Sequence, residues 1–191
     1  MKQFLVLLIS LTFTLFASSQ KKYPNTFESL KNGGKLIYTY TDSLDRVLLK
    51  HGKNSMELYS CSHDGLFIGL ELDGGNYFMI SWGGHGSGNP FFLDVYKEDS
   101  GTKEFSTEGF ILYEDTIKGL IVFDDKNKNI GFFTLYNLKT NTYKLFKEPD
   151  DNPCEPNGCW EVAALTNAKL KITYKDASDK ARTIEYDLTH K

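Results

Sequence analysis

The stretch GLFIGLELDGGNYFMISW, residues 65–82, holds two apolar runs on either side of an Asp-Gly-Gly turn. Glycines accept the backbone angles that a tight hairpin requires, so the stretch predicts antiparallel pairing of Leu66–Leu72 with Tyr77–Ser81 around Asp73–Gly75. Side chains alternate between the two faces of a strand. We therefore expect one face to carry Leu66, Ile68, Leu70 and Leu72, and the other face to carry Phe67 and Gly69.

The same pattern continues along the chain in both directions. Short runs rich in Tyr, Phe, Val, Ile and Thr alternate with Gly, Asn, Asp and Ser, which is typical of strands and tight turns. The connections are short, and short connections join neighbouring strands antiparallel. The sequence therefore predicts an all-β fold, an antiparallel meander of about 12–14 short strands arranged as a sandwich or a barrel.

Little of the chain favours helix. We expect residues 20–34 to form a short helical or extended lead-in, because Thr26 is a suitable N-cap for a helix over Thr26–Asn32. Residues 42–52 also fit a helical pattern. The β-branched and aromatic residues around them favour a hairpin that turns at Ser43–Asp45.

A weak internal repeat lies within the region of predicted strands. VYKEDSGT, residues 95–102, matches LYNLKTNT, residues 135–142, about 40 positions further on. Gly101 and Asn141 fall on the same place in the match, and both residue types accept a left-handed turn conformation. A spacing near 40 is typical of four-stranded propeller blades, so a small propeller-like arrangement is the alternative architecture. The tyrosines that precede hairpins at this spacing are Tyr59, Tyr96, Tyr136 and Tyr174.

The N-terminus has the order of properties of a signal peptide. Lys2 is followed by the uncharged apolar run Phe4–Phe16, which is too short to span a bilayer, and small residues come next. The sequence predicts a signal peptide over residues 1–19, cleaved before Gln20, and a mature chain in the periplasm or outside the cell. Residues 20–191, roughly 170 in number, are expected to form a single β-rich domain.

The three cysteines fit an oxidising compartment. Cys154 and Cys159 enclose the segment CEPNGC, in which Pro-Asn-Gly favours a tight turn that brings the two thiols together. The sequence therefore predicts a Cys154–Cys159 disulfide. It leaves Cys61 as an unpaired and buried small residue.

Charge and motifs exclude several classes of function. The chain has 22 Lys plus Arg against 25 Asp plus Glu, interspersed, so nucleic acid, which requires clustered positive charge, is not an expected partner. No second apolar stretch is long enough to cross a membrane, and we expect no stable membrane insertion of the mature chain. We expect no cofactor and no metal site. The segment Asp124–Gly131 fits a hairpin turn better than a calcium loop, because Tyr136 stands where such a loop requires Glu.

The segment SWGGHGSGNP, residues 81–90, is the most suggestive for chemistry. Its glycines permit close approach of a ligand, and we expect Trp82, His85, Ser87 and Asn89 to contact one. His85 and Ser87 are also weak candidates for a catalytic base and nucleophile. The segment does not match the nucleophile elbow of serine hydrolases, which needs Gly two positions before the serine and a strand that leads into a helix.

Aromatic residues make up 14% of the chain, and Tyr and Trp on a rigid β scaffold provide binding area at low entropic cost. The sequence thus favours an exported, non-catalytic binding or interaction module for a carbohydrate, a peptide or a partner protein. A small secreted hydrolase acting around His85 is the alternative. Glycoside cleavage requires two carboxylates at a defined distance from each other, and the sequence does not give that distance. The candidate carboxylates on or beside strands are Glu57, Glu71, Asp94, Glu108 and Glu114.

Overall fold

The computed structural model describes residues 25–41, 44–62, 66–84, 91–149, 160–166, 168–176, 178 and 180–189. Every regular element within these residues is a β-strand, and each pair of neighbouring strands is antiparallel, so the predicted all-β antiparallel meander is confirmed. The signal peptide at 1–19 and the Cys154–Cys159 disulfide lie outside the described residues and stay predictions. The strands are β1 (Thr26–Ser29), β2 (Lys35–Tyr40), β3 (Leu44–His51), β4 (Asn54–Ser62), β5 (Leu66–Asp73), β6 (Tyr77–Gly84), β7 (Phe91–Lys97), β8 (Lys103–Asp115), β9 (Leu120–Asp125), β10 (Phe132–Asn137), β11 (Thr142–Lys147), β12 (Glu161–Leu165), β13 (Lys169–Lys175) and β14 (Ala181–Asp187).

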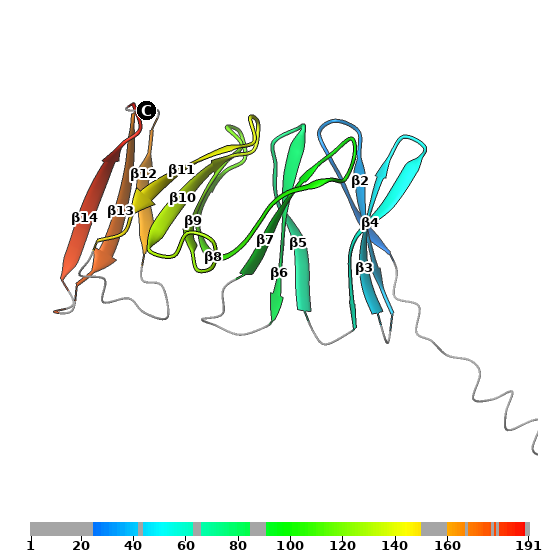
Figure 1. Ribbon diagram of the computed structural model, residues 1–191, viewed down its shortest axis with the longest axis horizontal. Coiled ribbons are helices and arrows are strands. Elements are labelled where there is room, and N and C mark those ends of the chain that lie inside the picture. Colours follow the sequence, from blue (N-terminus) through cyan, green and yellow to red (C-terminus); the bar gives the residue numbers. More distant parts are fainter. Residues whose placement is uncertain are drawn as a thin grey trace, which may run out of the picture.

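The strands form four layers that stack face to face (Figure 1). Layer I is the sheet β1-β2-β3-β4, and layer IV is the sheet β12-β13-β14. Between them lies one seven-stranded sheet in the order β11-β10-β9-β8-β7-β6-β5, which we divide at β8. Layer II comprises β5, β6, β7 and the first part of β8, and layer III comprises the rest of β8 with β9, β10 and β11.

The long strand β8 crosses from layer II to layer III. Phe105, in its first part, packs on Tyr143 of β11, with ring centroids 5.6 Å apart. Glu114, near its end, makes a hydrogen bond with Glu71 of β5. The first strand of layer II therefore opposes the first strand of layer III, and the last opposes the last. The strand order therefore runs in the same direction across both layers.

Three buried clusters fill the spaces between successive layers, and they explain the internal repeat. Tyr96, Tyr136 and Tyr174 each lie in the cluster that joins their own layer to the preceding one. The left-handed turn conformation expected at Gly101 and Asn141 is confirmed, with φ of 61° and 53°. Layers I and IV lie at opposite ends of the stack (Figure 1). The described strands therefore form an open, sandwich-like stack and neither a closed barrel nor a propeller ring.

Two local expectations need correction. Of the helical or extended lead-in expected for residues 20–34, the extended form is found at Thr26–Ser29, where strand β1 pairs with β2. Pairing with the sheet overrides the local helix signal over Thr26–Asn32. On β5, Ile68 and Leu70 face layer I, whereas Leu72 lies in the cluster that faces layer III. The register shifts between Leu70 and Leu72, and this bulge turns Leu72 to the opposite face.

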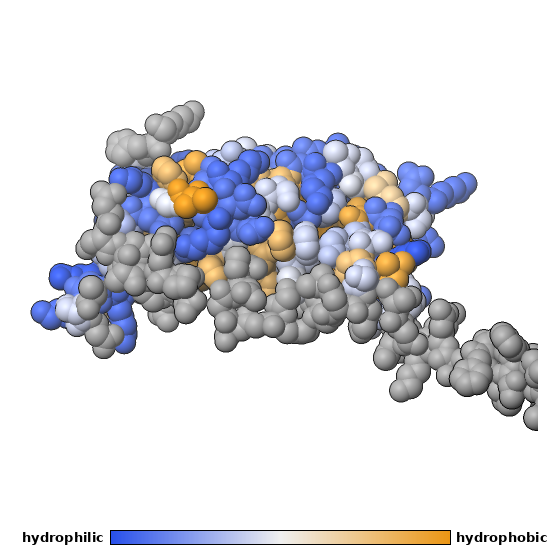
Figure 2. Space-filling model, turned by 60° about the horizontal axis from the view of Figure 1, so that its bottom comes forward, coloured by the Kyte–Doolittle hydropathy of each residue, from blue (hydrophilic) through white to orange (hydrophobic). Residues whose placement is uncertain are grey.

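The hairpin predicted between β5 and β6 is confirmed in its pairing. The hairpin between β2 and β3 is also formed, but Leu44 and Asp45 already belong to β3, so its turn comes earlier than the predicted Ser43–Asp45. Cys61, on β4, carries a free thiol, and its side chain is half-buried where the sequence favoured a buried one. Hydrophobic residues on the face shown in Figure 2 are scattered among hydrophilic ones. Within the described part of the chain, no helix is long and apolar enough to cross a membrane.

Candidate functional site

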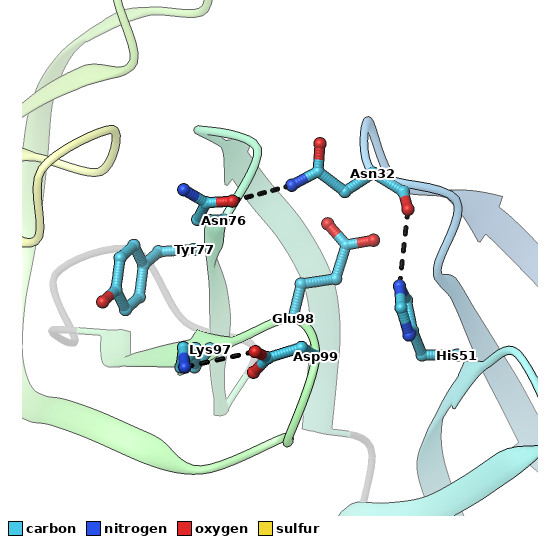
Figure 3. Close-up of a pocket in the computed structure, with 7 residues that line it drawn as sticks. All are labelled: Asn32, His51, Asn76, Tyr77, Lys97, Glu98 and Asp99. Atoms are coloured by element: carbon cyan, nitrogen blue, oxygen red, sulfur yellow. Dashed lines mark hydrogen bonds and ion pairs between the residues drawn. The ribbon is translucent and has the colours of Figure 1, made fainter.

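Four hairpin turns from layers I and II meet on one side of the stack, where their strands end, and enclose a cleft of about 460 Å³. Its volume lies in the range of small-molecule sites. We call it the turn-end cleft (Figure 3). The turns are those that join β1 to β2, β3 to β4, β5 to β6, and β7 to β8. The lining residues are Asn32, His51, Asn76, Tyr77, Lys97, Glu98 and Asp99.

The turn between β1 and β2 is fastened to layer II by its backbone and side chains. The backbone N–H of Lys31 donates to Asp73 Oδ2 at 2.6 Å, and Asn32 Nδ2 donates to Asn76 Oδ1 at 2.9 Å. The His51 ring approaches the backbone oxygen of Asn32, with Nε2 3.4 Å away. These contacts hold the two walls of the cleft together, so its shape is formed before any ligand arrives.

Glu98 is the central group of the cleft. It is only 1% exposed, and Oε1 accepts the backbone N–H of Gly34 at 2.7 Å. The approach is close, because a Cβ atom on Gly34 would lie 2.7 Å from the same oxygen. The other oxygen, Oε2, is buried and has no hydrogen-bond partner among the described residues. Figure 3 shows the carboxylate between Asn32 and His51.

Burial raises the pKa of Glu98, and the backbone amides of Gly34 and Asn32 oppose that rise. The neighbouring charges on the rim are paired. Lys97 Nζ lies 3.1 Å from Asp99 Oδ2, and this contact lowers the pKa of Asp99 and raises that of Lys97. Glu98 is therefore the one carboxylate of the described lining whose charge faces the cleft without a lysine or arginine beside it.

Trp82, the described residue of the site predicted from the sequence, lies toward the other end of β6. The other residues of that site, His85, Ser87 and Asn89, are outside the described part of the chain, and their expected contact with a ligand stays a prediction. Trp82 is half-buried. Its ring stacks on Phe92, with centroids 3.9 Å apart, and contacts Tyr59 at 4.8 Å. The structure does not bring Trp82 into the turn-end cleft.

The indole N–H of Trp82 is already used within the protein. It donates to Asp94 Oδ2 at 3.0 Å, and the same oxygen lies 2.7 Å from Lys103 Nζ. Ser106 donates to the other oxygen at 2.5 Å. Asp94 is fully buried, and these donors satisfy its carboxylate. Asp94 therefore acts as a structural centre that orients Trp82.

One pair of carboxylates comes together between layers II and III. Glu71 and Glu114 hydrogen-bond to each other, and the Ser81 hydroxyl also donates to Glu71. Burial and the hydrogen bond to Glu71 raise the pKa of Glu114 to about 7. Glycosidases keep their two carboxyl groups at least about 5 Å apart to admit the sugar or water. Carboxyl groups in direct contact do not fit that reaction.

The segment considered for calcium forms the turn between β9 and β10, as predicted. Asp125 Oδ1 accepts the backbone N–H groups of Asn127 and Lys128, at 3.1 and 2.8 Å. The side chain of Asn129 donates to the other oxygen at 2.8 Å. The turn thus uses its carboxylate to satisfy its own backbone.

Sequence reasoning did not single out Glu98, although the repeat contains a signal for it. In the match of 95–102 with 135–142, Glu98 falls on Leu138, which is fully buried. An apolar residue at the equivalent position indicates that position 98 is also a buried one.

The chain matches no known family and no curated protein.

Proposed function

We propose that the protein is an exported, non-catalytic binding module and that the turn-end cleft takes a small polar ligand, a sugar or a short peptide. The observation that carries this proposal is the cleft itself, which is preformed by turns from two layers and holds a buried carboxylate oxygen without a partner. Buried polar atoms in folded proteins nearly always have a partner, so an open one in a cleft favours a ligand.

The lining has the composition of a binding site for polar molecules. Asn32 and Asn76 offer amide groups for hydroxyl or peptide groups, and Tyr77 offers a ring on which a sugar can stack. None of the seven lining residues is Ser, Thr or Cys, and the His51 ring contacts a backbone oxygen and no nucleophile. The described lining of the cleft therefore lacks the serine or cysteine nucleophile with an adjacent base that the hydrolase alternative requires.

The test measures binding of glucose, N-acetylglucosamine, glucosamine and Nα-acetyllysine to the mature chain by NMR titration. We expect one of them to shift resonances of the cleft, and Asn32→Ala to weaken that ligand at least tenfold. Asn127→Ala, an exposed residue of the turn between β9 and β10, is the matched control and should leave the affinity unchanged. Equal binding by both variants and the wild type, or shifts confined to other regions, would refute the proposal.

The hydrolase alternative has its own test. A serine-directed covalent probe should leave Ser87 unlabelled in the wild type. Labelling that disappears in His85→Ala would show a nucleophile and base pair, and would contradict the non-catalytic part of the proposal.

A further inference from the structure

We propose that the ligand of the turn-end cleft carries a protonated primary amine, which Glu98 binds through Oε2. This inference rests on the proposed binding function and names the chemical group that the cleft selects. Three observations support it: the unsatisfied oxygen, the residue that occupies the equivalent place in layer III, and the balance of charge around the cleft.

The first observation is the geometry of the carboxylate. Gly34 approaches Oε1 closely and fixes the orientation of Glu98, while Oε2 remains buried without a donor among the described residues. A fixed carboxylate with one open oxygen is suited to a strong hydrogen-bond donor, and bonds between charged groups are the strongest of these. An ammonium group supplies such a donor together with the opposite charge.

The second observation is that the fold does not need a carboxylate here. Leu138 takes the equivalent place after β10, fully buried and packed over Gly74. The backbone of both positions is held in the same way, since the N–H of Glu98 donates to Asn76 at 2.9 Å and that of Leu138 donates to Gly119 at 2.8 Å. A leucine fills the equivalent position in layer III, so packing alone does not require a glutamate in layer II. We infer that Glu98 has a role other than packing.

The third observation is the charge around the cleft. Lys97 is paired with Asp99. Asp73 adds a further negative charge close enough to raise the pKa of Glu98, and His51 acts on that pKa in the opposite direction. A divalent metal requires several oxygen ligands, usually from more than one carboxylate. Here the backbone N–H of Gly34 already occupies Oε1 of Glu98, and Lys97 already pairs with Oδ2 of Asp99. An organic cation, which needs only one free carboxylate oxygen, fits this arrangement.

The experiment compares ligands that differ only in the amine. Glucosamine against glucose tests an amino sugar, and Nα-acetyllysine against its Nε-acetylated form tests a peptide side chain. We expect the wild type to bind one amine at least tenfold more tightly than its neutral counterpart. The pair in which the amine is preferred shows whether the natural ligand is an amino sugar or a peptide side chain.

Glu98→Gln keeps an oxygen for Gly34 and removes the charge, so the preference for the amine should fall to within about twofold. Glu98→Leu copies the residue of layer III and should fold and also lose the preference. The control is Glu104→Gln, which removes one negative charge from an exposed residue of β8. This variant should keep the preference for the amine.

Equal affinity for the charged and neutral members of both pairs would overturn the inference while leaving the binding function in place. A preference that survives in Glu98→Gln would overturn it as well. If no probe binds to the wild-type cleft, both the inference and the proposed function fail.

Discussion

Gly101 and Asn141 hold the same left-handed backbone conformation in equivalent turns of layers II and III, with φ of 61° and 53°. Their surroundings differ. A Cβ atom on Gly101 would lie 1.9 Å from Sδ of Met56, which belongs to the cluster between layers I and II. In layer III, the Tyr136 hydroxyl donates to the Asn141 side chain. The conformation belongs to the repeat, whereas the residue type at position 101 is set by Met56 of layer I and that at position 141 by Tyr136 of its own layer.

Gly101→Ala is expected to destabilise the protein for two reasons. The left-handed conformation costs an L-residue about 1–2 kcal/mol, and displacement of Met56 adds about 1 kcal/mol or more. Gly52→Ala is the control, because Gly52 has a similar φ of 58° but no atom within 4 Å of the added Cβ. Chemical denaturation should show the larger loss in Gly101→Ala, and equal losses would contradict the close packing of this turn on layer I.

The Glu71–Glu114 pair predicts stability that depends on pH. Because the pKa of Glu114 is raised from 4.5 to about 7 in the folded protein, its contribution is fully present below about pH 4.5 and is lost as the pH rises through about 7. The Glu114 carboxyl group is partly exposed, so we expect the free energy of unfolding to fall by only about 1 kcal/mol between pH 5 and 8. Thermal unfolding across this range measures it.

Glu114→Gln keeps a hydrogen bond to Glu71 and removes one charge, so the fall in stability above pH 5 should flatten. The exposed Glu104→Gln on β8 should leave the slope as in the wild type. A slope unchanged in Glu114→Gln would assign the pH dependence to other groups.

Asp94→Asn should destabilise the protein by about 3 kcal/mol, because it removes a buried charge and replaces one acceptor oxygen with an NH2 group that cannot accept from the surrounding donors. The fluorescence of Trp82 should change as well, since its N–H donates to Asp94. Asp99→Asn, a change in an exposed ion pair, should alter stability little. Denaturant titrations that give similar small losses for both variants would rule out Asp94 as the structural centre of layer II.

The predicted processing is tested by intact mass and thiol counting on protein exported to an oxidising compartment. We expect a chain that begins at Gln20, one disulfide between Cys154 and Cys159, and one free thiol at Cys61. Three free thiols, or a bridge that includes Cys61, would contradict the interpretation of the cysteines.

Much of the fold was predictable because its signals are local. Apolar alternation and turn residues indicated the strands, the hairpin between β5 and β6, and the left-handed conformation at Gly101 and Asn141. The bulge that turns Leu72 toward layer III was not predictable, because an extra residue in a strand leaves the apolar pattern unchanged. Strand β1 was expected only as the extended alternative to a helix, because its pairing with β2 outweighs the preference of its own residues.

The candidate site was less predictable because distant contacts create it. A glutamate in a hairpin turn normally faces solvent. Glu98 is buried because the turn that ends at Gly34, 64 positions earlier in the chain, covers it. The sequence drew attention to the glycine-rich segment 81–90, whereas the cleft lies at the turns between layers I and II.

The open stack has a consequence for how the molecule unfolds. The buried clusters join each layer only to its neighbours, as in linear arrays of repeats, so the stability of the whole is close to a sum of layers and interfaces. Layers I and IV each share one interface, whereas layers II and III each share two. Hydrogen exchange should therefore be fastest at the two ends and slowest around β8, which belongs to both inner layers. Loss of layer I alone would dismantle the turn-end cleft while the rest of the stack stays folded.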